Sequence, residues 1–472
     1  MRVRFELVMA LLFILNVFVP ADLAYSVDIT INGAKRYQNI EGFGTCLIAW
    51  SERFRKLYRT EKFQRIYVEG LGCNMLRVNV WGPTFEKPME DWRQIRYEDF
   101  DMGANGGRPR IFVDFGRAIL KINPQLKIIG TVWSPPAWMK MNKSITDKRS
   151  GAIRAGGYGN INNRVDPKYF RHFCKWMVEY VKIHDKQGIP FYAVSPGNEV
   201  QFTQSFESCV WDGRDYVTIL IMLREMLNDQ GYSHVRIFGP ETMTSHMYEG
   251  GTGSYIKAIM DNPKALEALD VFATHGYEDG VKAEMSATSS GRFWNMIKDT
   301  GKPFWITEGG TGGHDWPGPI HSGIGNALHN ALVAGNCSAF VPWQITEGRE
   351  SIHAIMVMSR YTLKTYTAMH YSKFIRPGAR RIDAGPGFGT VLVGAFWHEK
   401  NRDLTIVAIN PSEKEQTLNL TFNNLKGLAS LKVYRTSASE NLQEVGEVRV
   451  SNNNAAFQMT PRSIVTFSGK VS

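Results

Sequence analysis

Two glutamates, Glu199 and Glu308, are the strongest candidates for chemistry in this chain. Each ends a short apolar run, at 191–199 and 303–308, typical of a buried strand whose last residues reach a functional edge. A single glutamate at a strand end is commonplace, so neither residue is informative alone. One carboxyl group that donates a proton and a second that stays ionised form the pair that glycoside hydrolysis needs. Two glutamates at the ends of strands that finish at the same edge of a sheet could provide that pair.

The elements that must position these glutamates are eight short apolar runs separated by helical stretches. The clearest helix, 166–184, repeats its apolar residues at i, i+3, i+4, i+7 and i+8, with Asp166 as its cap and Pro167 at the first helical position. Strands that alternate with helices predict an α/β fold with a parallel sheet, and eight of them close into a (β/α)₈ TIM barrel. A doubly wound open sheet is the alternative, but Gly42-Phe43-Gly44 is only half of the turn motif it needs. The eight runs are 40–46, 75–81, 127–133, 191–199, 234–241, 270–277, 303–308 and 338–344.

After about residue 375 the pattern changes to short β-type runs divided by Gly, Asn and Pro turns. These runs predict a C-terminal antiparallel β-sandwich side domain, and the early strand 27–31 is expected to pair into its sheet. The predicted runs are 380–383, 389–397, 404–410, 417–422, 431–435 and 463–467. We therefore expect a signal peptide at 1–26, a strand joining the sandwich at 27–40, a catalytic barrel at 41–375 and the sandwich at 376–472.

The N-terminus has the pattern of a sorting signal. Arg2 and Arg4 precede a mostly apolar stretch, 7–19, and small residues follow at Ala21, Ala24 and Ser26. The stretch is shorter than the roughly 20 residues that a membrane-spanning helix needs, which favours a cleaved secretory peptide. We expect a secreted or periplasmic protein with no stable membrane anchor, and a monomer.

Composition restricts the partners and cofactors. The formal charge of +10 would suit a nucleic-acid binder, but Lys and Arg are scattered and no nucleic-acid motif is present, so no nucleic-acid partner is expected. Five cysteines without a CxxC pair argue against a zinc site, and we expect neither metal nor cofactor. Their odd number leaves at least one free thiol or an intermolecular bridge. Twelve tryptophans and eighteen tyrosines are a weak indication of a carbohydrate substrate, because aromatic faces stack on sugar rings.

Reactive groups of a TIM barrel lie at the carboxyl ends of its strands. The ends of the eight runs are dense in carboxylates, aromatic rings and amides, as an active-site rim would be. They supply Trp81, Trp133, Asn198, Glu199, Glu241, His275, Tyr277, Glu308, Trp343 and Gln344. Glu241 and Glu347 are the carboxylates most easily mistaken for catalytic ones.

Four segments resemble glycoside hydrolase family 30. The octapeptide WSPPAWMK at 133–140 is similar to the family's strand-three signature, and 192–199 and 304–308 resemble its acid/base and nucleophile strands. The segment 371–378 resembles the junction into its side β-sandwich. The family belongs to a clan of retaining (β/α)₈ enzymes and includes glucosylceramidases, endo-β-1,6-glucanases, endo-β-1,6-galactanases and glucuronoxylanases. The octapeptide is specific, whereas Asn-Glu and Thr-Glu alone are weak signals.

The resemblance implies a role for each matching residue. Glu199 would be the general acid/base, held protonated by burial and by the charge of Glu308, and Glu308 would be the nucleophile that forms a glycosyl–enzyme ester. Asn198 would donate to the sugar 2-hydroxyl. Arg77 matches a clan arginine that would keep Glu308 ionised, although a structural salt bridge explains it equally well.

Four more side chains are expected at the same site, each with a purely structural alternative. Tyr277 would hydrogen-bond Glu308, and His275 would line the same wall or simply pack within it. Trp133 and Trp343 are candidate sugar platforms or rim packing.

The resemblance leaves the substrate open. Val200 stands where the family usually has proline after the acid/base glutamate, and Pro196-Gly197 also departs from the common pattern. Xylan, β-1,6-glucan, β-1,6-galactan and a glucosylceramide-like glycoside all stay candidates. The polar segment 141–163 is long enough to shape the cleft and so to decide between exo and endo action. A carbohydrate-binding barrel without turnover is the alternative function.

Overall fold

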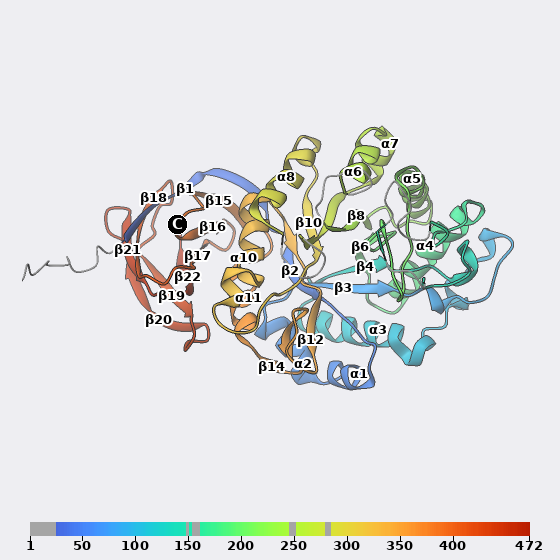
Figure 1. Ribbon diagram of the computed structural model, residues 1–472, viewed down its shortest axis with the longest axis horizontal. Coiled ribbons are helices and arrows are strands. Elements are labelled where there is room, and N and C mark those ends of the chain that lie inside the picture. The colour runs from blue at the N-terminus through green and yellow to red at the C-terminus, as the bar shows by residue number, and fades with distance from the viewer. Residues whose placement is uncertain (1–24, 148–150, 153–160, 245–251, 279–284) are drawn as a thin grey trace, which may run out of the picture.

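The chain folds into a barrel and a mostly antiparallel β-sheet domain that lie side by side (Figure 1). The computed structural model describes residues 25–147, 151–152, 161–244, 252–278 and 285–472. Residues 1–24, most of the predicted signal peptide, lie outside the described residues, as does much of the segment 141–163. The predicted fold class, a (β/α)₈ barrel with a C-terminal β domain, is confirmed.

All eight predicted apolar runs form strands of one closed parallel barrel. Its order is β10-β11-β2-β3-β4-β6-β8-β9, so chain neighbours pair around the ring and the last strand closes on the first. The strands are β2 (Gly42–Cys46), β3 (Met75–Val80), β4 (Lys127–Val132), β6 (Phe191–Ser195), β8 (Arg236–Thr244), β9 (Val271–Tyr277), β10 (Phe304–Glu308) and β11 (Ala339–Phe340).

An apolar layer and a polar layer follow one another along these strands. Met75, Ile129 and Ala273 belong to one buried cluster that also contains Trp305. Side chains two residues apart on a strand share a face. The residue two positions after each member of this cluster, such as Arg77 after Met75, therefore lies on the same inner face, nearer the carboxyl end of its strand. Arg77, Thr131, Ser195 and His275 all stand in this second layer and are all buried. The inward-facing side chains of the barrel therefore change from apolar to hydrogen-bonding within two residues along each strand.

Helices on the outside of the barrel cover its strands (Figure 1). For the predicted helix at 166–184, the side chain of Asp166 accepts from Lys168 N, Pro167–Tyr169 forms a 3₁₀ turn, and α4 continues from Phe170 to Lys186. The α-helices are α1 (Glu52–Tyr58), α2 (Glu61–Arg65), α3 (Ala104–Ile122), α4 (Phe170–Lys186), α5 (Gly213–Asp229), α6 (Thr252–Met260), α7 (Pro263–Ala268), α8 (Ala287–Ile297), α9 (Gly318–His321), α10 (Ile324–His329) and α11 (Leu363–Ser372).

The second domain is a nine-stranded sheet in the order β20-β19-β22-β17-β16-β15-β1-β18-β21. The six predicted β runs are strands, but β20 and β21 were not predicted: β20 is largely polar and exposed, and β21 is a short run whose buried residues are only Ala455 and Met459. The N-terminal strand β1 pairs antiparallel with β15 and parallel with β18, so the sheet is not wholly antiparallel. The strands are β1 (Tyr25–Asn39), β15 (Arg380–Gly385), β16 (Leu392–His398), β17 (Asp403–Asn410), β18 (Gln416–Asn423), β19 (Ser430–Thr436), β20 (Gln443–Arg449), β21 (Asn454–Met459) and β22 (Ser463–Lys470).

Helix α11 joins the two domains. The buried ring of His370 contacts Thr466 Oγ1 of β22 through Nδ1 at 2.7 Å and Thr436 Oγ1 of β19 through Nε2 at 2.9 Å. Burial lowers the pKa of His370 to about 3, so the ring stays neutral at this interface.

Two small sheets outside the barrel were not predicted. The strands β5 (Gly151–Ala152) and β7 (Phe202–Thr203) pair antiparallel. The strands β12 (Gln344–Glu347), β13 (Ala354–Val357) and β14 (Arg360–Tyr361) form a three-stranded sheet after β11. Both lie in loops that follow barrel strands, where tertiary contacts decide the conformation.

The structure also bears on two other features considered in the sequence, the cysteines and membrane-spanning segments. All five cysteines are buried and free, which leaves no disulfide within the chain. None of the helices in the described part of the chain has the length and apolar character needed to cross a lipid bilayer.

Candidate active site

Glu199 and Glu308 meet at the carboxyl ends of the barrel strands. Glu308 is the last residue of β10, and Glu199 lies four residues beyond the end of β6. Carboxyl oxygens of the two residues lie within 4.8 Å of one another, and both residues are 6 % exposed. The barrel thus brings together two acidic groups that are far apart in the sequence.

A shift in strand register puts Glu308 in this position. Between β9 and β10, Ile306 pairs with Thr274, but the next pair joins Glu308 to His275. An irregularity of this kind re-aims a side chain at a strand end. It places Glu308, rather than the preceding Thr307, opposite His275.

Glu199 is held in a strained backbone conformation. Its φ angle is +48°, in the left-handed region where a residue with a Cβ costs on the order of 1 kcal/mol. Its amide donates to the carbonyl of Glu241 at 2.8 Å, and its carbonyl accepts from Phe202 N at 2.7 Å. Glu241 has a positive φ as well, at +52°. Strained residues of this kind cluster at functional sites.

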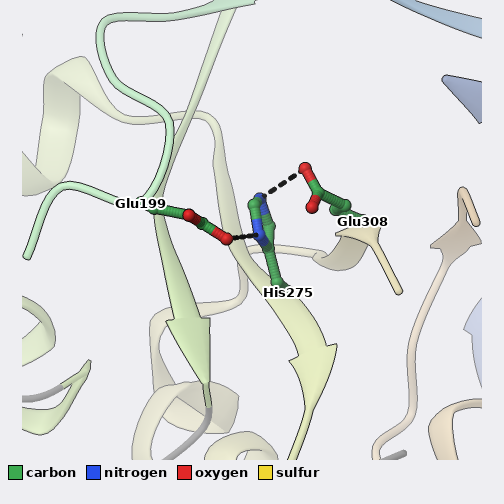
Figure 2. Close-up of side chains that lie close together, drawn as sticks. All are labelled: Glu199, His275 and Glu308. Atoms are coloured by element: carbon green, nitrogen blue, oxygen red, sulfur yellow. Dashed lines mark hydrogen bonds and ion pairs between the residues drawn. The ribbon is translucent and has the colours of Figure 1, made fainter. Parts of the chain in front are cut away.

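His275 lies between the two carboxyl groups (Figure 2). Its Nδ1 is 3.3 Å from Glu199 Oε1, and its Nε2 is 3.7 Å from Glu308 Oε2. Burial by itself lowers the pKa of His275, but Glu308 and hydrogen bonds to Glu199 and Glu241 outweigh burial and raise the pKa to about 9. The ring therefore carries a positive charge at neutral pH.

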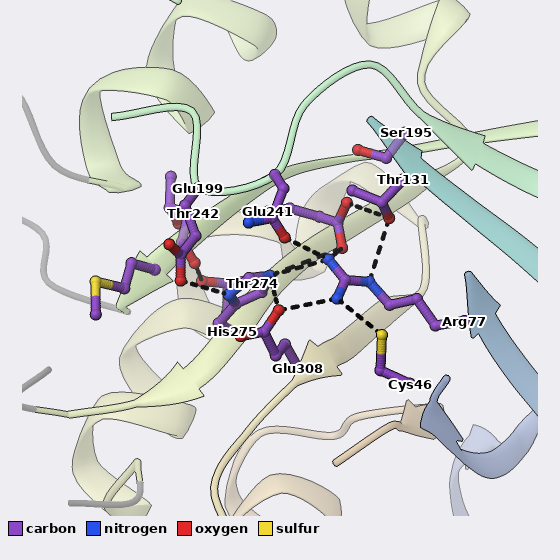
Figure 3. A network of polar contacts seen from close by, with 12 residues as sticks. Cys46, Arg77, Thr131, Ser195, Glu199, Glu241, Thr242, Thr274, His275 and Glu308 are labelled. Atoms are coloured by element: carbon purple, nitrogen blue, oxygen red, sulfur yellow. Dashed lines mark hydrogen bonds and ion pairs between the residues drawn. The ribbon is translucent and has the colours of Figure 1, made fainter. Parts of the chain in front are cut away.

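Arg77 is the second buried cation, and it connects the site to the barrel interior (Figure 3). Its Nη1 donates to Glu308 Oε2 at 2.8 Å, and its Nη2 lies 3.1 Å from Glu241 Oε1. The same Nη2 donates to the amide oxygen of Asn198 at 2.5 Å. The guanidinium also lies over the ring of Trp133, 4.4 Å from its centroid. Arg77 thus fixes the positions of three predicted site residues.

Glu241 is a counter-ion beneath the reaction centre. It is fully buried, and its Oε2 accepts from Thr131 Oγ1 at 2.8 Å. Burial raises the pKa of Glu241, but Arg77 and His275 outweigh burial and lower the pKa to about 2. Sequence reasoning placed Glu241 at a strand end without a role; its position opposite the arginine was not foreseen.

The electrostatic environment of Glu308 contains opposing influences. Burial raises the pKa of Glu308, as does the neighbouring Glu199, while His275, Arg77 and a hydrogen bond from Tyr277 oppose the rise. The phenol of Tyr277 donates to Glu308 Oε1 at 3.0 Å. The pKa of Glu308 is raised overall, with burial as the largest cause, although each of its oxygens has a donor that stabilises the ionised form.

The cluster of Glu199, His275 and Glu308 also has the spacing of a metal-ligand set. The position of Arg77 opposes a cation there, because its guanidinium already occupies Glu308 Oε2 and places a positive charge beside the cluster. The arrangement is better suited to proton transfer and attack by a carboxylate.

Comparison with known proteins shows which family the chain resembles. Residues 49–209 match the model of the glycosyl hydrolase family 30 TIM-barrel domain. The glucuronoxylanase XynC of Bacillus subtilis (strain 168) is 27 % identical over 457 residues, covering 93 % of this chain and 91 % of the relative. A putative glucosylceramidase of Caenorhabditis elegans is 24 % identical over 194 residues, covering 38 % and 35 %.

The fold comparison agrees. A glycoside hydrolase family 30 subfamily 8 xylanase from Clostridium acetobutylicum superposes with a TM-score of 0.73 at 20 % identity, covering 94 % of this chain and all of that structure. The chain is similar to glycoside hydrolase family 30 over most of its length. It is an O-glycosyl hydrolase that cleaves β-glycosidic bonds in a carbohydrate substrate.

The site of this glycoside hydrolase opens into a cleft of about 650 Å³. Asn198, Glu199, Tyr277 and Glu308 reach it from within the barrel. Its outer walls come mainly from the segments that follow the barrel strands and are largely apolar. They include Trp50, Trp81, Arg108, Trp133, Phe202, Gln204, Phe206, Glu207, Met243, Trp343, Gln344, Glu347 and His353.

The two predicted sugar platforms differ in how much ring surface is free. Trp133 is 6 % exposed, with Arg77 over its ring and Trp343 at 5.9 Å between centroids. Trp343 is half-buried. Of the pair, Trp343 offers the larger accessible surface to a ligand.

Gln204 is a site residue that sequence reasoning missed. Its Nε2 donates to Glu199 Oε2 at 3.2 Å, so the oxygens of Glu199 contact both Gln204 and His275. Gln204 itself is held by its backbone N–H, which donates to Ser208 Oγ at 2.9 Å. A glutamine five residues after the glutamate carries no recognisable signal, because the loop conformation alone brings the two together.

Lys140, the last residue of the octapeptide, fixes that loop. Its Nζ donates to Asn163 Oδ1 at 2.5 Å and to the carbonyl of Ser208 at 2.7 Å. Burial lowers the pKa of Lys140 to about 8, and Asn163 Nδ2 donates to Ser208 Oγ at 2.8 Å. The specific octapeptide thus supports the loop that contacts Glu199.

Replacing Arg77 by methionine is expected to lower the free energy of unfolding by about 3–5 kcal/mol, because the buried carboxylates Glu241 and Glu308 would lose one of the two cations that balance their charges. Denaturant unfolding followed by fluorescence measures the change. Arg93→Met is the matched control, since Arg93 pairs with Asp91 at the surface and its loss should change the midpoint little. Equal shifts in the two variants would contradict the role of Arg77 as a buried counter-charge.

Proposed function

We propose that this β-glycoside hydrolase is an exported, retaining enzyme in which Glu308 is the nucleophile and Glu199 the general acid/base. The separation of the two carboxyl groups carries the proposal. Oxygens within 4.8 Å are close to the roughly 5–5.5 Å of retaining enzymes and well short of the roughly 6.5–9.5 Å that an inverting enzyme needs for its water.

Charge balance supports the assignment of the two roles. Arg77 and His275 are cations, and Glu241 and Glu308 are their anionic partners within the same buried network. These four charges cancel. Glu199 is then the carboxyl group that can hold a proton without leaving an uncompensated charge in the barrel.

In the first step, Glu308 attacks the anomeric carbon and Glu199 gives its proton to the leaving oxygen. The bond from the anomeric carbon to that oxygen breaks, and a glycosyl ester with Glu308 forms. Arg77 holds one oxygen of Glu308 and Tyr277 the other, so they position the attacking carboxylate. Arg77 also holds the amide oxygen of Asn198, leaving its NH₂ group to donate to the sugar 2-hydroxyl.

In the second step, ionised Glu199 takes a proton from water, and the water oxygen attacks the anomeric carbon. The ester bond to Glu308 breaks, and the product leaves with the configuration of the substrate. His275 contacts both glutamates, so its positive charge stabilises whichever of them is ionised at each stage.

The charges of the described cleft favour a neutral β-linked glycan. Arg108 is a cation of the outer wall, but it pairs with Glu207 at 3.5 Å and lies over Trp81 at 4.7 Å. Glu347 adds a negative charge to the same lining. Unsubstituted xylan, β-1,6-glucan and β-1,6-galactan suit this lining better than a chain branched with uronic acids. Export rests on the N-terminal pattern of the sequence, an apolar stretch after Arg2 and Arg4.

The test is hydrolysis of a panel of neutral and glucuronylated β-glycans, with the anomeric configuration of the first products followed by NMR. We expect neutral chains to be cut, with β-configured products appearing first. Products that first appear in the α configuration would exclude the double displacement. Binding without turnover across the panel would instead support a carbohydrate-binding barrel.

A further inference from the structure

A second cavity lies at the end of the barrel away from the catalytic cleft. Its volume of about 410 Å³ falls within the roughly 300–1,000 Å³ of small-molecule sites. Lys127 is the first residue of β4, Arg236 is the first residue of β8, and Lys302 lies two residues before β10; all three line this cavity. The strands are parallel and the cleft lies at their carboxyl ends, so we name this space the amino-end cavity.

Positive charge dominates the described lining of the amino-end cavity. Lys127, Arg236 and Lys302 are its cations and Glu41 is its anion, which leaves two positive charges in excess. Glu41 Oε2 lies 2.6 Å from Arg236 Nη1 and accepts from the phenol of Tyr192 at 3.0 Å. Lys127 Nζ is farther from the same oxygen, at 3.8 Å, and donates to the carbonyl of Glu41 at 2.9 Å. The carboxylate therefore balances Arg236 and not the two lysines.

The surroundings of Lys302 do not remove this excess. Burial lowers the pKa of Lys302, Asp270 opposes that change, and the charges of Arg236 and Arg224 lower the pKa further. Asp270 is itself paired with Arg224. The pKa of Lys127 is lowered as well, chiefly by burial. An anion between these groups would relieve the repulsion among the cations.

Groups able to donate hydrogen bonds surround these cations. The ammonium of Lys302 and the indole N–H of Trp294 have no hydrogen-bond or ion-pair partner within the described ranges of the chain. Asn336 accepts through Oδ1 from Arg381 Nη2 at 3.3 Å, which leaves its NH₂ group to donate. Trp294 is half-buried and lines the cavity, so part of its ring surface is accessible. Ammonium groups recognise an oxyanion, and an aromatic ring with amide donors recognises a sugar ring.

We propose that the amino-end cavity binds an anionic sugar, with the oxyanion of the ligand beside Lys302 and Lys127 and its ring against Trp294. The cavity is separate from the reaction centre, so this inference does not rest on the roles of Glu199 and Glu308. A ligand held there leaves the cleft open to the substrate. Phosphate and carboxylate both accept from ammonium groups, so glucose 6-phosphate and glucuronate are the two probes.

Calorimetric titration of the wild-type chain with each probe tests the site. One or both should bind at a ratio of 1:1, with an affinity that falls as salt is added, and neutral glucose should bind more weakly. Lys302→Met should weaken the binding about tenfold, because a charge-assisted hydrogen bond is lost. Lys302 is only partly buried, so the fold should be retained. Lys298→Met, an exposed lysine of the turn Lys298–Thr300 outside the lining, is the matched control and should bind as wild type does.

A cleft variant separates the two cavities. Trp343→Ala should leave the affinity for the anionic sugar unchanged, since Trp343 lines the cleft and not the amino-end cavity. Equal affinities of wild type and Lys302→Met, weaker binding in Trp343→Ala, or no binding of either probe would overturn the inference. Hydrolysis of β-glycans is measured separately, so none of these results bears on the proposed function.

Discussion

Glu308→Gln is expected to lower kcat by more than about 10⁴-fold, beyond the range typical for the loss of a proton-transfer group alone. The amide is isosteric, its oxygen can still accept from Arg77, and its NH₂ group can donate to the phenol oxygen of Tyr277, so the fold should be retained. It cannot form the glycosyl ester, because a neutral amide is a poor nucleophile. Steady-state kinetics measure the loss, and circular dichroism verifies the fold. Glu61→Gln, an exposed glutamate of α2, is the matched control and should keep wild-type activity.

The smaller variant Glu308→Ala tests the face of attack. Added azide can occupy the space of the missing carboxylate and attack the anomeric carbon directly, in one displacement. We expect the product to be an α-glycosyl azide, with configuration opposite to that of the β-linked substrate. Turnover near wild type in either Glu308 variant would show that the nucleophile is another residue.

The barrel could be predicted because its signals are local and repeated. Eight apolar runs separated by helical periodicity specify a parallel sheet, and polar residues at the run ends mark its functional rim. The strands that bear Glu199 and Glu308 were therefore recognisable before any geometry was known. The β20 and β21 strands were not, since both lie at the edges of the sheet, where few side chains are buried and the apolar signal is weak.

The supporting groups of the site were harder to predict, because long-range packing determines them. Glu241 and Thr131 join Arg77 only because three strands bring them to one level of the barrel. The register shift that places Glu308 opposite His275 leaves no mark in the sequence.

The departure at Val200 also has a structural explanation. Val200 is fully buried, and its carbonyl accepts from Trp211 N at 2.8 Å and from the phenol of Tyr255 at 3.4 Å. These contacts fix the residue that follows Glu199. Valine at this position therefore does not leave the acid/base loop without support.

Glu199→Ala is expected to lower kcat about 10²–10⁴-fold on a natural glycan, because both the leaving oxygen and the attacking water lose their proton-transfer group. An aryl glycoside with an acidic phenol needs no protonation of its leaving group. On that substrate the first step should stay fast and the second become limiting, so a burst of phenol equal to the enzyme concentration should precede a slow steady rate. Stopped-flow absorbance measures the burst.

Azide separates this role from that of Glu308. In Glu199→Ala the glycosyl ester with Glu308 still forms, and azide can attack it from the face that Glu199 has vacated. Two displacements return the original configuration, so the product should be a β-glycosyl azide and the steady rate should rise with azide concentration. The two alanine variants thus lead to opposite anomers from one substrate, which no merely structural role for either glutamate can produce. An α-glycosyl azide from Glu199→Ala, or no response to azide, would assign proton transfer to another group of the buried network.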